Sequence, residues 1–287
     1  MKLIVVALIA FVMSVMGPVM AADWHVSGTG SDLTGNGSSV LPFRTITMAM
    51  NGASNNDVIK VHAGTYTVLA GEVFPIDIKY GVDILGQEMS TASYPQVGGD
   101  VNDSGVEALF HIDARSASRT NTQIKFIRFV AEDSAGKDAP SALLMQVAGG
   151  YSSSSNVMES CIVERSEMHL SGGSGRAALL FDAGYGTLDF EVKTCTINAS
   201  TRGGVEVEVG TSADSTAHES VVQFTLRGTT VQCLGDEVAE FGVRYGGVGL
   251  KHATFHTSTL GCAIDSTQVS NSSCGAANGL VLEALPT

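Results

Sequence analysis

The sequence predicts an all-β solenoid, in which short strands stack coil upon coil. Four segments align without internal gaps: "NVMESCIVERSE" from Asn156, "FEVKTCTINAST" from Phe190, "FTLRGTTVQCLG" from Phe224 and "ATFHTSTLGCAI" from Ala253. Each holds one kernel, which reads apolar, two polar, small, polar, apolar. Short strands that recur with variable connections cannot bury their inner faces alone, so they must stack on one another.

The kernel copies begin 34, 34 and 29 residues apart, and the alignment groups their residues into columns. The first apolar column is Met158, Val192, Leu226 and Phe255, and the small column is Cys161, Cys195, Thr229 and Ser258. A fainter earlier copy is "IKFIRFVA". It has Phe126 in the first apolar column, Phe129 in the small column and Ala131 in the second apolar column. The columns predict that Cys161 stacks on Cys195 and Cys233 on Cys262. Strand spacing lies inside the Cα window for a disulfide, so the stacking of these pairs is compatible with bonding. Cys262–Cys274, which closes a short loop near the C-terminus, is the competing disulfide pair.

A second strand element follows each kernel, usually after a glycine-rich connection. Its copies are "ALLMQV" from Ala142, "AALLF" from Ala177, "VEVEV" from Val205, "GVRY" from Gly242 and "GLVLE" from Gly279. Alternation of apolar and polar residues and β-branched content indicate strands. No linker interrupts the series, so we expect one domain.

The N-terminal part differs from these repeats. Trp24–Ser27 reads as a strand, and Arg44–Ala53 reads as a helix with Ile46, Ala49, Met50 and Ala53 on one face. Terminal repeats of a solenoid must cover its open end, so this helix is predicted to be a cap. The Gly/Asn run between them is either a plain turn or a calcium loop. Asp32 and Asn36 alternate as metal ligands do, but no Glu follows at loop position 12.

The kernel is similar to that of pectin-lyase-like right-handed parallel β-helix proteins, with Cys, Thr and Ser in the column where that family has asparagine. From Trp24 to about Gln87, "WHVSGTGSDLTGNGSSVLPFRTITMAM", "DVIKVHAGTYT", "GEVFPIDI" and "GVDILGQ" resemble a domain of unknown function that opens many such proteins. The resemblance implies one right-handed parallel β-helix over residues 22–287. Residues 22–87 form the cap and first coil, and residues 88–287 form the further coils.

The catalytic motifs of the enzymes with this fold are missing. The Asn-Thr-Asp, Asp-Asp, Gly-His-Gly and Arg-Ile-Lys motifs of polygalacturonases do not occur. Pectin methylesterases share "AGTY" at Ala63–Tyr66, but their Asp-Phe-Ile-Phe-Gly and Gly-Arg-Pro-Trp motifs are also missing. The catalytic residues of these families therefore cannot be transferred to this chain.

Residues 1–21 read as a secretory signal peptide. Lys2 precedes a short apolar run that ends in Val19-Met20-Ala21, which predicts cleavage before Ala22 and a secreted, periplasmic or cell-surface protein. No later stretch is apolar enough to span a bilayer. The net charge of −13 disfavours nucleic acid as a partner. The seven histidines are scattered, and we expect them, including His252 and His256, at the surface.

A candidate ligand groove follows from the alternation in "VEVEV". If the valines point inward, Glu206 and Glu208 point outward together. Aligning the glycines before each strand places Arg244 beside Glu206, with Asp182 close by. Carboxylates beside an arginine resemble the sites of calcium-dependent polysaccharide lyases, although a solvated ion pair has the same pattern.

These observations favour an exported, non-catalytic β-helix protein that binds polysaccharide or a cell-envelope glycan. The alternatives are a polysaccharide lyase or hydrolase that acts on acidic polysaccharide, and a structural spike or fibre protein. No cofactor motif is present, and calcium is the one ion for which the carboxylates provide candidate ligands.

Overall fold

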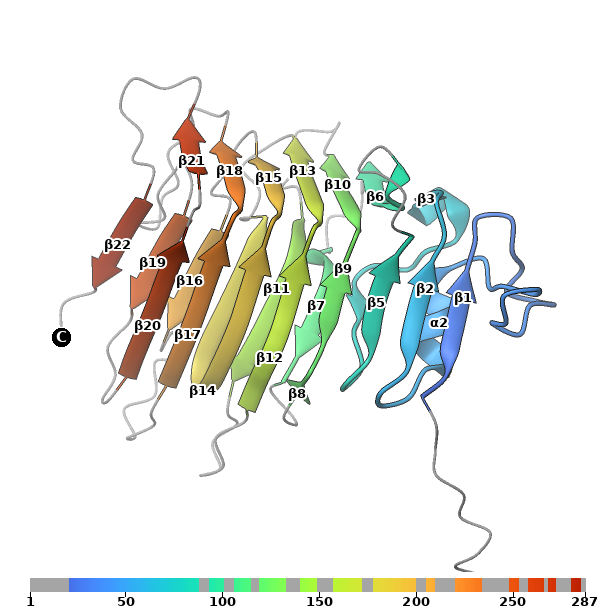
Figure 1. Ribbon diagram of the computed structural model, residues 1–287, viewed down its shortest axis with the longest axis horizontal. Helices are drawn as coiled ribbons and strands as arrows, with labels where there is room; N and C mark the ends of the chain where they lie inside the picture. Colours follow the sequence, from blue (N-terminus) through green and yellow to red (C-terminus); the bar gives the residue numbers. More distant parts are fainter. Residues whose placement is uncertain are drawn as a thin grey trace, which may run out of the picture.

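The structure is a computed structural model that describes residues 21–87, 93–100, 106–114, 119–132, 140–148, 157–171, 178–199, 205–209, 220–233, 248–252, 258–265, 268–271 and 280–284. Strands from these ranges stack side by side into an elongated solenoid (Figure 1). Every pair between the described strands is parallel. The predicted all-β, parallel β-helix fold is confirmed.

Each full coil contributes one strand to each of three faces, here called sheets A, B and C. Sheet A contains β1 (Asp23–Val26), β2 (Val58–Val61), β5 (Asp83–Gly86), β8 (Arg119–Thr120), β9 (Gln123–Lys125), β12 (Val157–Glu164), the second half of β14 (Leu179–Lys193), β17 (Ser220–Arg227) and β20 (Ser258–Asp265). Sheet B contains β3 (Thr65–Tyr66), β6 (Gln96–Asp100), β10 (Arg128–Glu132), β13 (Glu167–Ser171), β15 (Thr196–Ala199), β18 (Thr230–Cys233) and β21 (Gln268–Asn271). Sheet C contains β4 (Ile76–Asp77), β7 (Ala108–Asp113), β11 (Ser141–Ala148), the first half of β14, β16 (Val205–Val209), β19 (Val248–His252) and β22 (Leu280–Ala284). In the described part of the chain, β14 joins sheets A and C into one 15-stranded sheet, while sheet B has seven strands.

The strand register corrects the kernel alignment. Val192 pairs with Leu226, as predicted, so the second and third copies are confirmed. The first copy was wrong, because Val192 pairs with Val163 rather than with Met158. The fourth copy was also wrong, because the partner of Leu226 is Ile264 and not Phe255. The earlier faint copy begins at Ile124, which pairs with Val163, rather than at Phe126.

The kernel marks the corner at which the chain passes from sheet A to sheet B. Its third position has a left-handed backbone in four successive coils: Phe126 (φ 59°), Arg165 (φ 49°), Thr194 (φ 52°) and Gly228 (φ 57°). Such a residue turns the chain sharply within one position, although side-chain sterics disfavour it for residues other than glycine. The sequence did not reveal this requirement, because four different residue types satisfy it.

The small residue that follows is buried and holds neighbouring corners together. We call Ser166, Cys195 and Thr229 the corner ladder. Thr229 Oγ1 accepts a hydrogen bond from the backbone N–H of Cys195 at 3.4 Å, and Ser166 Oγ accepts one from the N–H of Ile127 at 3.3 Å. In these three coils the buried side chain is compact and bonds to backbone groups of the corner, whereas the first of the four coils has the buried Ile127 at this position.

This register also overturns the predicted cysteine stacking. Cys161 lies in sheet A opposite Phe190, whereas Cys195 belongs to the corner ladder. Cys233 lies in sheet B and Cys262 in sheet A, so these two residues do not stack either. Both described side chains, those of Cys161 and Cys195, are buried thiols outside any disulfide. Cys274 lies outside the described residues.

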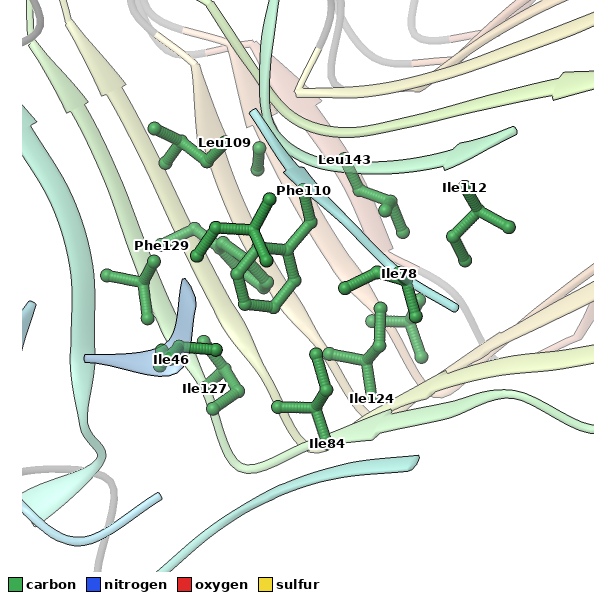
Figure 2. Close-up of a cluster of buried hydrophobic side chains, with 14 of the residues drawn as sticks. Ile46, Ile78, Ile84, Leu109, Phe110, Ile112, Ile124, Ile127, Phe129 and Leu143 are labelled. Carbon is green, nitrogen blue, oxygen red and sulfur yellow. The ribbon is translucent and has the colours of Figure 1, made fainter. Parts of the chain in front are cut away.

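The core fills the space between the three sheets (Figure 2). Phe110 from sheet C meets Phe129 from sheet B edge to face, with ring centroids 5.0 Å apart and an interplanar angle of 89°. Ile84 and Ile124 from sheet A close the third side. Because all three inner faces share one core, a single coil has no stable core of its own.

The N-terminal end is covered by helix α2 (Ile46–Gly52), which contacts β1, β2 and β4 (Figure 1). Thr45 is its N-cap, and the Thr45 side chain accepts a hydrogen bond from Met48 N at 3.1 Å. The predicted face is confirmed, since Ile46, Ala49 and Met50 are buried. A short 3₁₀ helix, η1 (Val68–Ala70), follows β3.

Candidate functional site

Three of the four predicted groove residues, Asp182, Glu206 and Glu208, lie in sheet C, where the strand register groups residues into two rows. The first row contains Asp77, His111, Leu144, Leu180, Glu206 and Gly249. The second, here called the polar row, contains Asp113, Gln146, Asp182, Glu208 and Lys251. The backbone therefore sets Asp182 directly opposite Glu208. The side chains of Asp182, Glu206 and Glu208 lie outside the described residues.

The predicted neighbour of Glu206 was wrong. Aligning glycines placed Arg244 beside it, but the strand that pairs with β16 is β19, which begins at Val248. Glu206 is opposite Gly249, and Glu208 is opposite Lys251. The basic residue of the polar row is therefore Lys251. Arg244 itself lies outside the described residues.

The first residues of β14 show which side of sheet C their side chains face. Leu179 belongs to the main core, as expected for an inward residue. Leu180 is also buried, but it belongs to a separate cluster with Ala108 and Leu144. Sheet C is thus covered on its outer side at this point of the first row.

A histidine that the sequence analysis did not single out lies in the same face. His111 Nδ1 is 2.8 Å from Asp77 Oδ1, and His111 Nε2 is 3.0 Å from Gln146 Oε1. The His111 side chain is 11% exposed, whereas that of Asp77 is 75% exposed. The expectation that the histidines lie at the surface is therefore wrong for His111. Asp77 and Gln146 fix the His111 ring from both sides, and the solvent-exposed group of the three is the Asp77 carboxylate.

The signal for this arrangement was present in "FHIDA" and "FPIDI", which both alternate apolar and polar residues. Alternation places Asp77 and His111 on the same side of their strands. Their pairing could not be predicted, because almost a full coil, including β5 and β6, lies between β4 and β7, and the lengths of its connections set the register.

The candidate calcium ligands near the N-terminus have structural partners. Asp32 Oδ1 accepts hydrogen bonds from Arg44 N at 2.8 Å and Thr45 N at 3.1 Å, and Asp32 Oδ2 accepts one from Thr45 Oγ1 at 2.8 Å. Asn36 Oδ1 accepts a hydrogen bond from Ser38 N at 3.1 Å. These residues shape the turn that leads into α2. In the described ranges, no group of three or more His, Cys, Asp or Glu side chains could hold a metal ion.

Within the same ranges, no helix is long and apolar enough to cross a membrane.

Comparison with known families places the N-terminal part of the chain. Residues 28–138 match the family described as "Protein of unknown function (DUF1565)". The resemblance predicted for the segment from Trp24 to about Gln87 is therefore confirmed, and it extends further along the chain. No curated protein matches the sequence significantly.

Among solved structures, the chain is similar to a rhamnogalacturonan lyase, with a TM-score of 0.51 and 12% identity over 85% of this chain and 62% of that one. The chain thus spans less than two thirds of that lyase. Weaker matches are pectin methylesterases from carrot (TM-score 0.36, 12% identity, 95% of this chain and 89% of that one) and Aspergillus niger (TM-score 0.32, 14% identity, 91% and 92%). The chain has a pectin-lyase-like, right-handed parallel β-helix fold.

Proposed function

We propose that this chain is an exported, non-catalytic β-helix protein that binds polysaccharide along the outer face of sheet C. The observation that carries the proposal is the polar row, in which Asp113, Gln146, Asp182, Glu208 and Lys251 succeed one another across neighbouring coils. Hydrogen-bonded strands repeat about every 4.8 Å, so the row offers a ladder of polar groups parallel to the solenoid axis. An extended polymer can contact such a ladder at several units.

The charges in the row restrict the kind of glycan. Carboxylate and amide oxygens accept hydrogen bonds from sugar hydroxyls. Three of the five positions are acidic and one is basic, and the exposed Asp77 carboxylate lies beside them. This charge balance repels a polyuronate unless a divalent cation lies between the two, because carboxylate oxygens are the ligands that calcium prefers. We therefore expect neutral glycans to bind directly and acidic glycans to bind only with calcium.

The proposed export depends on the signal peptide predicted for residues 1–21. Fold alone does not imply function, so the test must address the site. A glycan array probed with the wild type identifies the ligand. The variant Asp113→Asn/Asp182→Asn/Glu208→Gln should lose binding to that ligand at least tenfold, because the row then loses three charged acceptors.

The matched control is Asp23→Asn/Glu132→Gln/Glu191→Gln, which neutralises three carboxylates on sheets A and B and should bind like the wild type. Polyuronates are tested with and without calcium. The absorbance of new double bonds is followed in the same samples. Equal binding by both triple variants would contradict the proposed face, and the formation of unsaturated products would contradict the non-catalytic role.

A further inference from the structure

We propose that His25 and His62 form a binding site for a divalent transition-metal ion on the outer face of sheet A. His25 Nδ1 lies 3.1 Å from His62 Nε2, and the ring centroids are 5.4 Å apart. The site is far from the polar row in the fold, being on another sheet, and it does not depend on the proposed function.

The backbone explains why the two rings meet. β1 pairs with β2, and the N–H of His62 donates to the carbonyl of Val26 at 2.9 Å, so the pairing continues past the end of β2. Val26 and Val61 are buried in the core. Alternation then directs the preceding His25 and the following His62 to the outer face. Both imidazoles are half-buried and so are partly accessible to solvent.

The distance between the two nitrogens suits a shared metal ion. Zinc–nitrogen bonds are about 2.0–2.1 Å long, so two imidazoles on a tetrahedral ion have nitrogens about 3.3 Å apart. The two nitrogens need to separate by only a few tenths of an ångström, and both rings must tilt so that their lone pairs converge on the ion. In the metal-free pair, a proton on one ring can lie between the two nitrogens. When the ion binds, that proton moves to the other nitrogen of its own ring, leaving Nε2–H on His25 and Nδ1–H on His62.

The surroundings leave space for the remaining ligands. The histidines line a pocket of about 280 Å³ that Lys60, Leu85, Gln87 and Phe126 complete. The Lys60 ammonium is held by the Asp23 carboxylate at 2.5 Å, so its charge is compensated by an ion pair. The positions of the ion that the protein does not fill open toward this pocket, where water or a ligand oxygen can occupy them.

The donor set decides the kind of ion. Two imidazoles without a thiolate favour copper, nickel or zinc, whereas calcium and magnesium prefer oxygen ligands. The described residues supply no third His, Cys, Asp or Glu that could join the pair. We therefore expect exchangeable binding in the order Cu²⁺ before Zn²⁺ rather than a permanent structural ion.

The test is calorimetry with ZnCl₂ and CuCl₂ on the full chain, purified without a polyhistidine tag. One ion should bind per chain, and His25→Gln and His62→Gln should each weaken binding at least tenfold. The matched control is His169→Gln, which removes a partly exposed histidine that contacts Glu167 and Asn198 on sheet B. The heat of a calcium titration should be the same for the wild type, His25→Gln and His62→Gln.

A second measurement needs no variant. Substoichiometric Cu²⁺ should broaden the imidazole NMR signals of His25 and His62 before those of the other histidines. Absence of zinc and copper binding to the wild type would overturn the proposal. So would binding that survives both substitutions, or broadening centred on other histidines.

Discussion

The backbone nitrogen of Ala22 lies 2.7 Å from Oδ1 of Asp57. Asp57 is only 5% exposed, and its other oxygen accepts hydrogen bonds from Trp24 Nε1 at 2.9 Å and Ser54 N at 2.8 Å. The sequence predicts signal-peptide cleavage immediately before Ala22. Cleavage there would convert this neutral donor into an α-ammonium group, which would give the buried carboxylate a cationic partner.

We therefore predict that the protein starting at Ala22 is more stable than a form that retains Ala21 and one or more preceding residues. The uncleaved form already has a hydrogen bond to the charged carboxylate, so the difference is the added attraction of a charged donor, which should be about 1 kcal/mol. Denaturant unfolding of both forms measures it, and Asp57→Asn should abolish most of the difference. Asp23→Asn, at the exposed ion pair with Lys60, is the control. Equal stability of the two forms would contradict the prediction.

Acid should remove the contribution of Asp57. Burial by itself raises the pKa of this carboxyl, but the hydrogen bonds from Trp24, Ala22 and Ser54 outweigh burial and hold the pKa below its usual value. A carboxyl with a lowered folded pKa stabilises the fold above its unfolded pKa, about 3.9, and this contribution is lost as the pH falls through the folded pKa. The free energy of unfolding of the wild type and of Asp57→Asn should converge below about pH 4. A difference that stays constant from pH 6 to pH 2 would refute this assignment.

Glu72 should show the opposite pH dependence. It is 2% exposed and accepts hydrogen bonds from Ile46 N at 2.6 Å and Thr47 N at 3.0 Å, at the start of α2. Burial raises the pKa of this carboxyl, and the charge of Asp32 adds to the effect, although the hydrogen bonds from Thr47 and Ile46 oppose it. Because the pKa of Glu72 is higher in the folded than in the unfolded state, the protonated carboxyl contributes stability that is fully present below the unfolded pKa, about 4.3. This contribution is lost as the pH rises through the folded pKa.

Two substitutions separate the charge of Glu72 from its hydrogen bonds. Glu72→Gln keeps an acceptor and carries no charge, so its stability relative to the wild type should improve as the pH rises above about 4.3. Glu72→Ala leaves two helix N–H groups unpaired and should cost about 2 kcal/mol below about pH 4.3. This cost should shrink as the pH rises, because the wild type then loses the stability linked to the raised pKa of Glu72. Thermal or denaturant unfolding at several pH values measures both. A pH-independent Glu72→Gln difference would show that the carboxyl is not perturbed by burial.

Removing one side-chain oxygen from the corner ladder should lower the free energy of unfolding. Thr229→Val keeps the shape of the side chain but removes the acceptor for the N–H of Cys195, which should cost about 1–3 kcal/mol. Cys195→Ser should cost no more than about 1 kcal/mol, because serine already occupies the equivalent corner at Ser166 and makes the same kind of hydrogen bond. Urea unfolding compares the two. A larger loss for Cys195→Ser than for Thr229→Val would reverse the expected order.

The thiols of Cys161 and Cys195 should be inert in the native protein. Burial raises the pKa of each thiol to about 12, so the reactive thiolate is scarce at neutral pH. Iodoacetamide labelling followed by peptide mass spectrometry should find both residues unmodified in the native protein and modified after unfolding. Peptide mapping without reductant should show no link between them. Rapid native labelling of either residue would mean that its corner or strand opens.

The repeats in the sequence predicted a stacked solenoid, because recurring short strands with variable connections bury their inner faces by stacking. The resemblance to pectin-lyase-like proteins added that the strands are parallel. The face of α2 was also predictable, because Ile46, Ala49 and Met50 follow helical spacing within a single segment. The helix face depends on residues that are close together in the chain, and each repeat is recognised within one short segment. Periodicity therefore contains the information needed to find them.

Register between coils depends on the lengths of the loops, and the sequence does not give the register. The shared cysteine in "ESC" and "KTC" aligned Cys161 with Cys195, whereas the structure pairs Val163 with Val192 and gives Cys195 a place in the corner ladder. The same uncertainty put Arg244 beside Glu206, where the structure has Gly249. The sequence by itself determined which side of a strand a residue occupies, because alternation is local, but it put the strand beside "VEVEV" at Gly242 rather than at Val248. Only the tertiary structure decided which side chains meet, such as His111 with Asp77 and His25 with His62. Each such contact joins neighbouring coils, so it depends on the length of the whole coil between the two paired strands.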